Sequence, residues 1–142
     1  MVHHWIFVSL PYTDYNTGTI NEFIGKIKQS GKWAIGRRTV YRRQIGAGDR
    51  VLFYQAGEVK GFVGLGEIAS GLQTDKEDIF DFVLVKDIDL WDRPVSIDGL
   101  LACLPFIKDK RHWGLYFRGG VNRIGKEDYE LVLSKVKRKR GV

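Results

Sequence analysis

Short apolar runs separated by polar turns make up most of the hydrophobic pattern of this chain. Each run has the length of a strand, and the glycine, proline and polar residues between them are typical of turns. The turn at 56–58 joins two of these runs as a hairpin. The predicted strands are 5–9, 50–55, 60–69 and 79–90, the last ending before Pro94, with one or two more within 111–123.

Helical spacing occurs near the two ends of the sequence. Thr19 and Glu22 have the spacing of a capping box, and apolar residues then recur at helical intervals as far as Ser30. Residues 126–138 predict a closing helix, with acidic residues at its start and basic residues at its end. Segments 39–45 and 95–104 predict a helical turn and a short apolar helix or turn. Few helices and no βαβ repeat indicate an α+β domain, a small twisted barrel of about five to six strands with flanking helices.

Two glycines lie on one face of the predicted strand 60–69. Side chains alternate between the faces of a strand, so Gly64 and Gly66 point the same way. Close packing of the first helix or barrel curvature is the favoured interpretation, and a groove without side chains is the alternative. The spacing is also half of a dinucleotide fingerprint, but its place within a hairpin strand excludes a Rossmann site.

Length and charge set the class of protein and of partner. The 142 residues predict a single domain over 1–142 with a basic tail at about 137–142. The net charge of +6 favours an anionic partner, nucleic acid before a membrane surface, over a merely soluble basic chain. The single cysteine excludes an internal disulfide, and no apolar stretch approaches ~20 residues. We therefore expect a cytoplasmic protein without a membrane span, with a monomer favoured and the oligomeric state otherwise open.

The candidate binding chemistry is aromatic and basic. Trp33 has the small neighbour Ala34 and is followed by four arginines, a combination that suits a stacked base with phosphates nearby. A ring that stacks on a base is expected to be half exposed, and a tryptophan buried in the core is the competing interpretation. The residues expected to contact the phosphate backbone are Arg37, Arg38, Arg42, Arg43, Arg111 and Arg118.

No residue pattern indicates catalysis, a metal or a cofactor. His112 has no obvious partner at readable spacing, and Cys103 lies in an apolar run that predicts a core thiol. The aspartates and glutamates of 75–81 and 87–92 are typical of solvated loops rather than of a cation site. We therefore expect a protein that is not an enzyme.

The order of the motifs resembles the EVE domain of the PUA-like superfamily. The matching pieces cover nearly the whole chain, each weak alone and together fairly specific. They are Trp5-Ile6-Phe7-Val8, Trp33, Gly48-Asp49, Val51-Leu52-Phe53-Tyr54, Gly61 to Glu67, Arg93 to Ile97, Trp113, Phe117-Arg118-Gly119 and Asp128-Tyr129.

The resemblance implies a PUA-like barrel and a module that reads a modified base, for example a methylated one, in DNA or RNA. EVE domains resemble YTH domains, which hold methylated adenine in an aromatic cage. Trp33 matches the cage tryptophan, and the resemblance gives the base pocket as Trp33, Ala34, Ser9, Leu10, Tyr12, Tyr54 and Gln55. Loop 70–78 holds no aromatic where YTH domains have a second cage tryptophan. Either Trp113, Tyr12 or another ring completes the wall, or the pocket has one face and a different selectivity.

Two other functions stay open at this point. A ribonuclease like the related ASCH domains would use His112, Tyr116 and Arg118 without a metal. A protein–protein adaptor with an incidental basic surface would show no salt-dependent affinity for nucleic acid.

Overall fold

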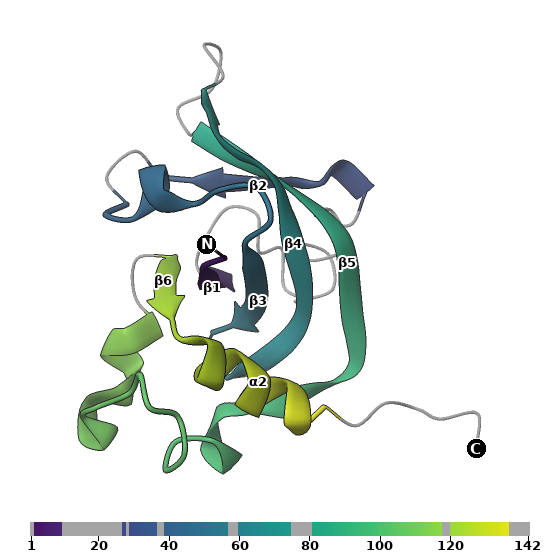
Figure 1. Cartoon of the computed structure of the whole chain (residues 1–142). Coiled ribbons are helices and arrows are strands. Elements are labelled where there is room, and N and C mark those ends of the chain that lie inside the picture. The colour runs from purple at the N-terminus through teal and green to yellow at the C-terminus, as the bar shows by residue number, and fades with distance from the viewer. Residues whose placement is uncertain are drawn as a thin grey trace.

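Six strands form one strongly curved sheet in the computed structural model of this chain (Figure 1). The structure describes residues 2–9, 27, 29–36, 39–56, 60–74, 81–117 and 120–136, without the side chains of 92, 110 and 115–117. The strands are β1 (His4–Ser9), β2 (Lys32–Ile35), β3 (Arg50–Gln55), β4 (Gly61–Thr74), β5 (Asp81–Ser96) and β6 (Val121–Ile124). Their order is β2-β5-β4-β3-β1-β6, with β1 and β3 parallel and the other neighbours antiparallel.

Helical structure in the described residues is sparse. One α-helix, α2 (Lys126–Ser134), follows β6, and the 3-10 segments are η1 (Arg42–Gln44), η2 (Ile97–Gly99) and η3 (Lys110–Phe117). The predicted barrel of about six strands is therefore confirmed as a half-barrel that is mostly β. The first predicted helix lies largely outside the described residues, and so do residues 137–142. No helix of the described part is long and apolar enough to cross a membrane.

The curvature of the sheet closes an inner core. Strands β2 and β1 are separated by three strands in the sheet order, yet Trp33 of β2 stacks on Phe7 of β1 with ring centroids 5.5 Å apart. This contact requires the sheet to curl until β2 lies over β1. A second core lies on the other face of β1 and β3, where Ile6 and Leu52 pack with Val132 of α2.

Gly64 and Gly66 allow β4 and β5 to cross closely. A Cβ at Gly64 would lie 2.5 Å from the backbone oxygen of Asp89, and one at Gly66 would lie 2.7 Å from a methyl group of Val85. The register between these strands also shifts at several places, as expected where a sheet bends sharply. The two glycines therefore allow close packing against β5 and leave no open groove at these positions.

Several sequence-based assignments were wrong. Strand β2 was not predicted, and residues 70–74, predicted as part of a loop, belong to β4. Strand β5 does not end before Pro94 but continues to Ser96, because Pro94 lies in the irregular stretch between the pairs Leu90–Gly64 and Val95–Phe62. A residue without an N–H is tolerated where the ladder is already interrupted.

The segment 110–117, predicted as a strand, is the 3-10 segment η3. The side chain of Asp109 accepts a hydrogen bond from the backbone N–H of Arg111 at 3.1 Å, a local bond that favours a turn over an extended strand. Among the described residues of the predicted range 111–123, those from Val121 onward are extended, in β6 (Val121–Ile124).

Candidate functional site

Three aromatic rings from three strands form the centre of the inner core. Trp33 stacks on Phe7 and lies 5.3 Å from Phe53, centroid to centroid. Strand alternation places Trp33 and Ile35 inside and leaves Lys32 and Ala34 exposed. Only 4% of the Trp33 surface is exposed, so the expectation of a half-exposed ring is corrected: in this structure the indole belongs to the core.

Two polar side chains continue the inner face where β1 and β3 end. Ser9 and Gln55 are register partners, and alternation puts them on the same face as Phe7 and Phe53. They are 2% and 3% exposed. Within the described part of the chain, Ser9 Oγ and Gln55 Oε1 have no hydrogen-bond partner, although Gln55 Nε2 donates to the Ala56 oxygen at 3.3 Å. Each unpaired buried polar atom costs about 1–3 kcal/mol, so this pair is a site where a ligand or water is expected.

The structure brings together only some of the residues predicted for the base pocket. Ser9, Gln55 and Trp33 share the inner face. Tyr54 points to the opposite face and packs edge-on against Phe62, and burial raises its pKa above the ordinary value. Trp113 packs against the same second core, so it does not complete a wall with Trp33.

Ala34 lies on the exposed side of β2, away from the inner core, because it alternates with Trp33. Leu10 and Tyr12 lie outside the described residues, and so do Arg37, Arg38 and Arg118. Their predicted roles stay predictions.

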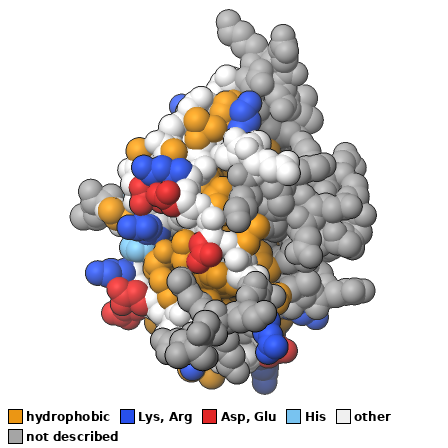
Figure 2. Space-filling model, turned by 90° about the vertical axis from the view of Figure 1, so that its right-hand side faces the viewer, with side chains coloured by type: hydrophobic (Ala, Val, Ile, Leu, Met, Phe, Trp, Pro, Cys, Tyr) orange, Lys and Arg blue, Asp and Glu red, His pale blue; other side chains and the backbone are white. Residues whose placement is uncertain are grey.

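The described arginines of the predicted phosphate-binding set do not form one cluster. Arg42 Nε lies 4.0 Å from a carboxylate oxygen of Asp81, whereas Arg43 and Arg111 are exposed. On the face shown in Figure 2, basic and acidic side chains alternate along one side instead of gathering by sign. Of the described arginines in this set, Arg42 therefore lies near a carboxylate, and Arg43 and Arg111 lie on the surface.

The two candidate catalytic residues also differ from expectation. His112 does have a partner, since its Nδ1 lies 2.9 Å from Asp109 Oδ2, and this interaction lowers the pKa of the Asp109 carboxyl. Both side chains are exposed. Cys103 is exposed rather than a core thiol, because Leu100 and Leu104 take the buried positions of that turn. No group of three metal-ligating side chains occurs among the residues described.

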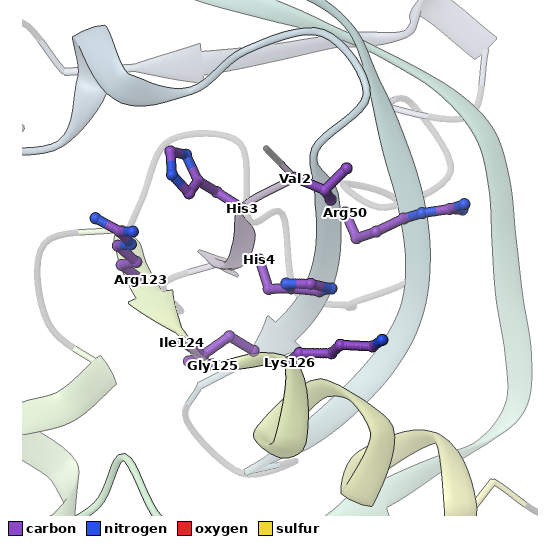
Figure 3. Close-up of a pocket in the computed structure, with 8 residues that line it drawn as sticks. All are labelled: Val2, His3, His4, Arg50, Arg123, Ile124, Gly125 and Lys126. Atoms are coloured by element: carbon purple, nitrogen blue, oxygen red, sulfur yellow. The ribbon is translucent and has the colours of Figure 1, made fainter.

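Sequence reasoning missed a basic cavity at the other end of β1. Its eight lining residues come from the chain start, β3, β6 and the beginning of α2 (Figure 3). The residues are far apart in sequence and no spacing rule connects them. Only the parallel pairing of β1 with β3, and the antiparallel pairing of β1 with β6, brings them together.

Comparison with known proteins places the chain in a family. A sequence model described as EVE domain matches residues 3–135. A UPF0310 protein of Mycolicibacterium vanbaalenii is 31% identical over 107 residues, which are 65% of this chain and 70% of that protein.

Solved structures share the fold at low identity. The human THYN1 protein, in complex with 5-methylcytosine containing DNA, superimposes with a TM-score of 0.68 at 17% identity, over 97% of this chain and 99% of that one. ASCH from Zymomonas mobilis gives a TM-score of 0.59 at 14% identity, over 95% and 96% of the two chains. Both the family match and the fold agree with the resemblance seen in the sequence motifs, and the chain belongs to the EVE domain family.

Proposed function

We propose that this protein is a non-catalytic nucleic-acid-binding module that takes one flipped or unpaired base, preferring a modified one, against Ser9 and Gln55. The observation that carries the proposal is the pair of buried, unpartnered atoms Ser9 Oγ and Gln55 Oε1 beside an aromatic cluster. The THYN1 structure with methylcytosine DNA supports this class of ligand for the fold.

The side chains of Ser9 and Gln55 supply hydrogen-bond donors and acceptors that complement those at the edge of a base. The amide oxygen of Gln55 accepts a hydrogen bond from an exocyclic amine, and the hydroxyl of Ser9 donates to a ring nitrogen or carbonyl. A methyl group on the base adds about 0.8 kcal/mol when it is buried against apolar side chains. The aromatic cluster supplies that apolar environment.

Burial of the site limits its affinity in the free protein. Ser9, Gln55 and Trp33 are all under a tenth exposed, so a base reaches them only after a local rearrangement. A binding-competent state that is populated only in part reduces the apparent affinity by that fraction. Flipping a base out of a duplex costs a few kcal/mol more. We therefore expect single-stranded or mismatched substrates to bind more tightly than a perfect duplex.

The decisive experiment measures binding and stability on the same variants. Ser9→Ala and Gln55→Leu remove the unpartnered atoms. We expect both to weaken binding of an oligonucleotide carrying one 5-methylcytosine by about tenfold, while the free energy of unfolding stays level or rises. Fluorescence anisotropy and urea denaturation measure the two quantities. The control is Ser96→Ala, whose hydroxyl lies on the exposed start of η2 and accepts from Asp98 N–H.

The two variants also separate the proposal from a purely structural role. If buried water satisfies Ser9 and Gln55, both variants lose stability and keep wild-type binding, and the base site is refuted. Equal affinity for methylated and plain cytosine would refute the preference for a modified base and leave base binding itself supported.

Ribonuclease activity is the second candidate, and the pair His112–Asp109 is the observation that favours it. An aspartate that holds a histidine is the arrangement of a general base with its orienting group. Both side chains of the pair are, however, exposed to solvent. Incubation with labelled RNA in the presence of EDTA tests this candidate. Cleavage that disappears in His112→Ala would replace our proposal with the enzymatic one.

A further inference from the structure

The side-chain amide of Gln55 is held in one orientation at the end of β3. Its Nε2 donates a hydrogen bond to the backbone oxygen of Ala56 at 3.3 Å, and its Oε1 is buried without a hydrogen-bond partner. Half a turn of the amide would exchange the two atoms and set Oε1 against the Ala56 oxygen, so that two acceptors would face each other. The Ala56 carbonyl therefore decides that the oxygen, and not the nitrogen, of this amide is left for a ligand.

The backbone around Gln55 is in turn held by the neighbouring strands. The backbone N–H of Ala56 donates to the backbone oxygen of Ser9 at 3.0 Å, next to the register pair of Ser9 with Gln55. On its other side, Gln55 pairs with Gly61 of β4. A side chain supported by strands on both sides is positioned more precisely than one on a loop. The acceptor Oε1 thus has a defined place in the site.

Ser9 supplies the other buried polar group of the site, and its hydroxyl is less demanding. Within the described part of the chain, Ser9 Oγ has no hydrogen-bond partner. A hydroxyl both donates and accepts, because it rotates about its C–O bond to suit the group opposite. Ser9 can therefore match a donor or an acceptor of a base, whereas Gln55 Oε1 can be satisfied only by a donor.

The exocyclic groups of the bases differ in this same property. Cytosine carries an amine, which donates, where thymine carries a carbonyl, which accepts. 5-Methylcytosine and thymine share the methyl group, so burial against Phe7 and Phe53 does not distinguish them. Opposite Gln55 Oε1, the amine forms a hydrogen bond, whereas the carbonyl leaves two buried oxygens without a donor. The ring N–H of thymine reaches Oε1 only if the base shifts along its edge, which displaces the methyl group.

We infer that Gln55 determines the specificity of the proposed base site, and that the site selects bases with an exocyclic amine over bases with a carbonyl at that place. The inference rests on the proposed function, since it concerns the same two side chains. A site that leaves a buried polar group unpaired with the wrong ligand discriminates strongly against it. We expect 5-methylcytosine to bind about ten- to a hundredfold more tightly than thymine in the same single-stranded sequence.

Competitive fluorescence anisotropy on the full chain tests the inference. The labelled probe is a single-stranded oligonucleotide with one 5-methylcytosine, and the competitors carry 5-methylcytosine, thymine or an abasic site at that position. Gln55→Met keeps a side chain of similar length without the fixed acceptor, so the ratio of affinities for the two bases should fall to about twofold or less. Ser9→Ala is the matched control. It should weaken binding of both bases and keep their ratio, because the hydroxyl suits either one.

Base selectivity and base binding fail separately in this experiment. Equal affinities for 5-methylcytosine and thymine, both above that of the abasic competitor, would overturn the selectivity and leave base binding supported. A wild-type preference that folded Gln55→Met retains would overturn the role of Gln55. Equal affinities for all three competitors would refute the proposed function and the inference with it.

A second pair of bases tests the selectivity without any variant and decides if Gln55→Met does not fold. Hypoxanthine differs from adenine in carrying a carbonyl where adenine carries the amine. Adenine should therefore bind more tightly than hypoxanthine by a factor similar to that between 5-methylcytosine and thymine. Hypoxanthine that binds as tightly as adenine would overturn the inference.

Discussion

The indole nitrogen of Trp5 donates a hydrogen bond of 2.9 Å to the carboxylate of Asp49, and both side chains are buried. The same carboxylate accepts from the backbone N–H groups of His3 and Gly46. The side chain of Asp49 thus links β1 to the turn that precedes β3. It also links Trp5 of the inner core to His3 of the basic cavity.

Asp49→Ala should therefore destabilise the fold strongly. The change leaves three donors without an acceptor, and we expect a loss of about 2–4 kcal/mol in the free energy of unfolding. Urea denaturation measures it. Asp98→Ala, at an exposed aspartate of η2, is the control and should stay within about 0.5 kcal/mol of wild type. A loss at Asp49 no larger than at Asp98 would show that the network is not structural.

Trp33→Ala should behave as a core substitution. Because the ring is buried against Phe7 and Phe53, its removal should cost about 3–5 kcal/mol of stability. Trp33→Phe should recover much of this loss, since it keeps an aromatic ring in the stack. Thermal and urea unfolding report both. A Trp33→Ala protein as stable as wild type would restore the half-exposed ring expected from the sequence.

Gly64→Ala should be destabilising although alanine is small. The new Cβ would lie 2.5 Å from the Asp89 backbone oxygen, so strand β5 has to move, at a cost of about 1–3 kcal/mol. Gly99→Ala is the matched control, because a Cβ there meets nothing within 4 Å. Calorimetric melting of both variants decides; equal melting temperatures would mean that the two strands do not cross this closely.

Acid should weaken the fold through His4. Burial lowers its pKa in the folded chain below the ordinary 6.5, so between the two values the unfolded chain binds a proton that the folded chain does not. The contribution of neutral His4 is therefore complete above about pH 6.5 and is lost as the pH falls below it. Urea denaturation at a series of pH values should show that the free energy of unfolding of His4→Gln falls less steeply with decreasing pH than that of the wild type. An unchanged slope in His4→Gln would contradict the assignment.

Affinity for nucleic acid should fall steeply with added salt. Each phosphate contact contributes a slope of about −0.9 to the plot of log affinity against log salt for duplex DNA, and we expect at least two such contacts. Arg42→Gln/Arg43→Gln should lower the slope more than deletion of residues 137–142, because these arginines closely follow Trp33 in the sequence. Anisotropy titrations at several salt concentrations measure it. A slope near zero would favour the adaptor hypothesis.

Local signals in the sequence determined the strands, the family and one part of the site. Alternating or continuous apolar runs with turn residues at their ends predicted β1, β3 and the start of β4, because those signals act between near neighbours. The resemblance to EVE domains named Ser9 and Gln55 as pocket residues, and both lie in the proposed site. The sequence also predicted close packing at the two glycines of β4, but only the structure shows that the neighbour is β5.

Only the tertiary structure determined which side chains lie in which of the two cores. The pattern around Trp33 suits both a pocket and a core, and the curl that brings β2 over Phe7 and Phe53 settles its burial. Trp113 and Tyr54 lie in the second core because both faces of the sheet are covered. The sequence of a single segment does not show which face is covered by which other segment. The cavity lined by Arg50, Arg123 and Lys126 forms because strands from distant segments pair. Local sequence patterns do not predict such long-range pairing.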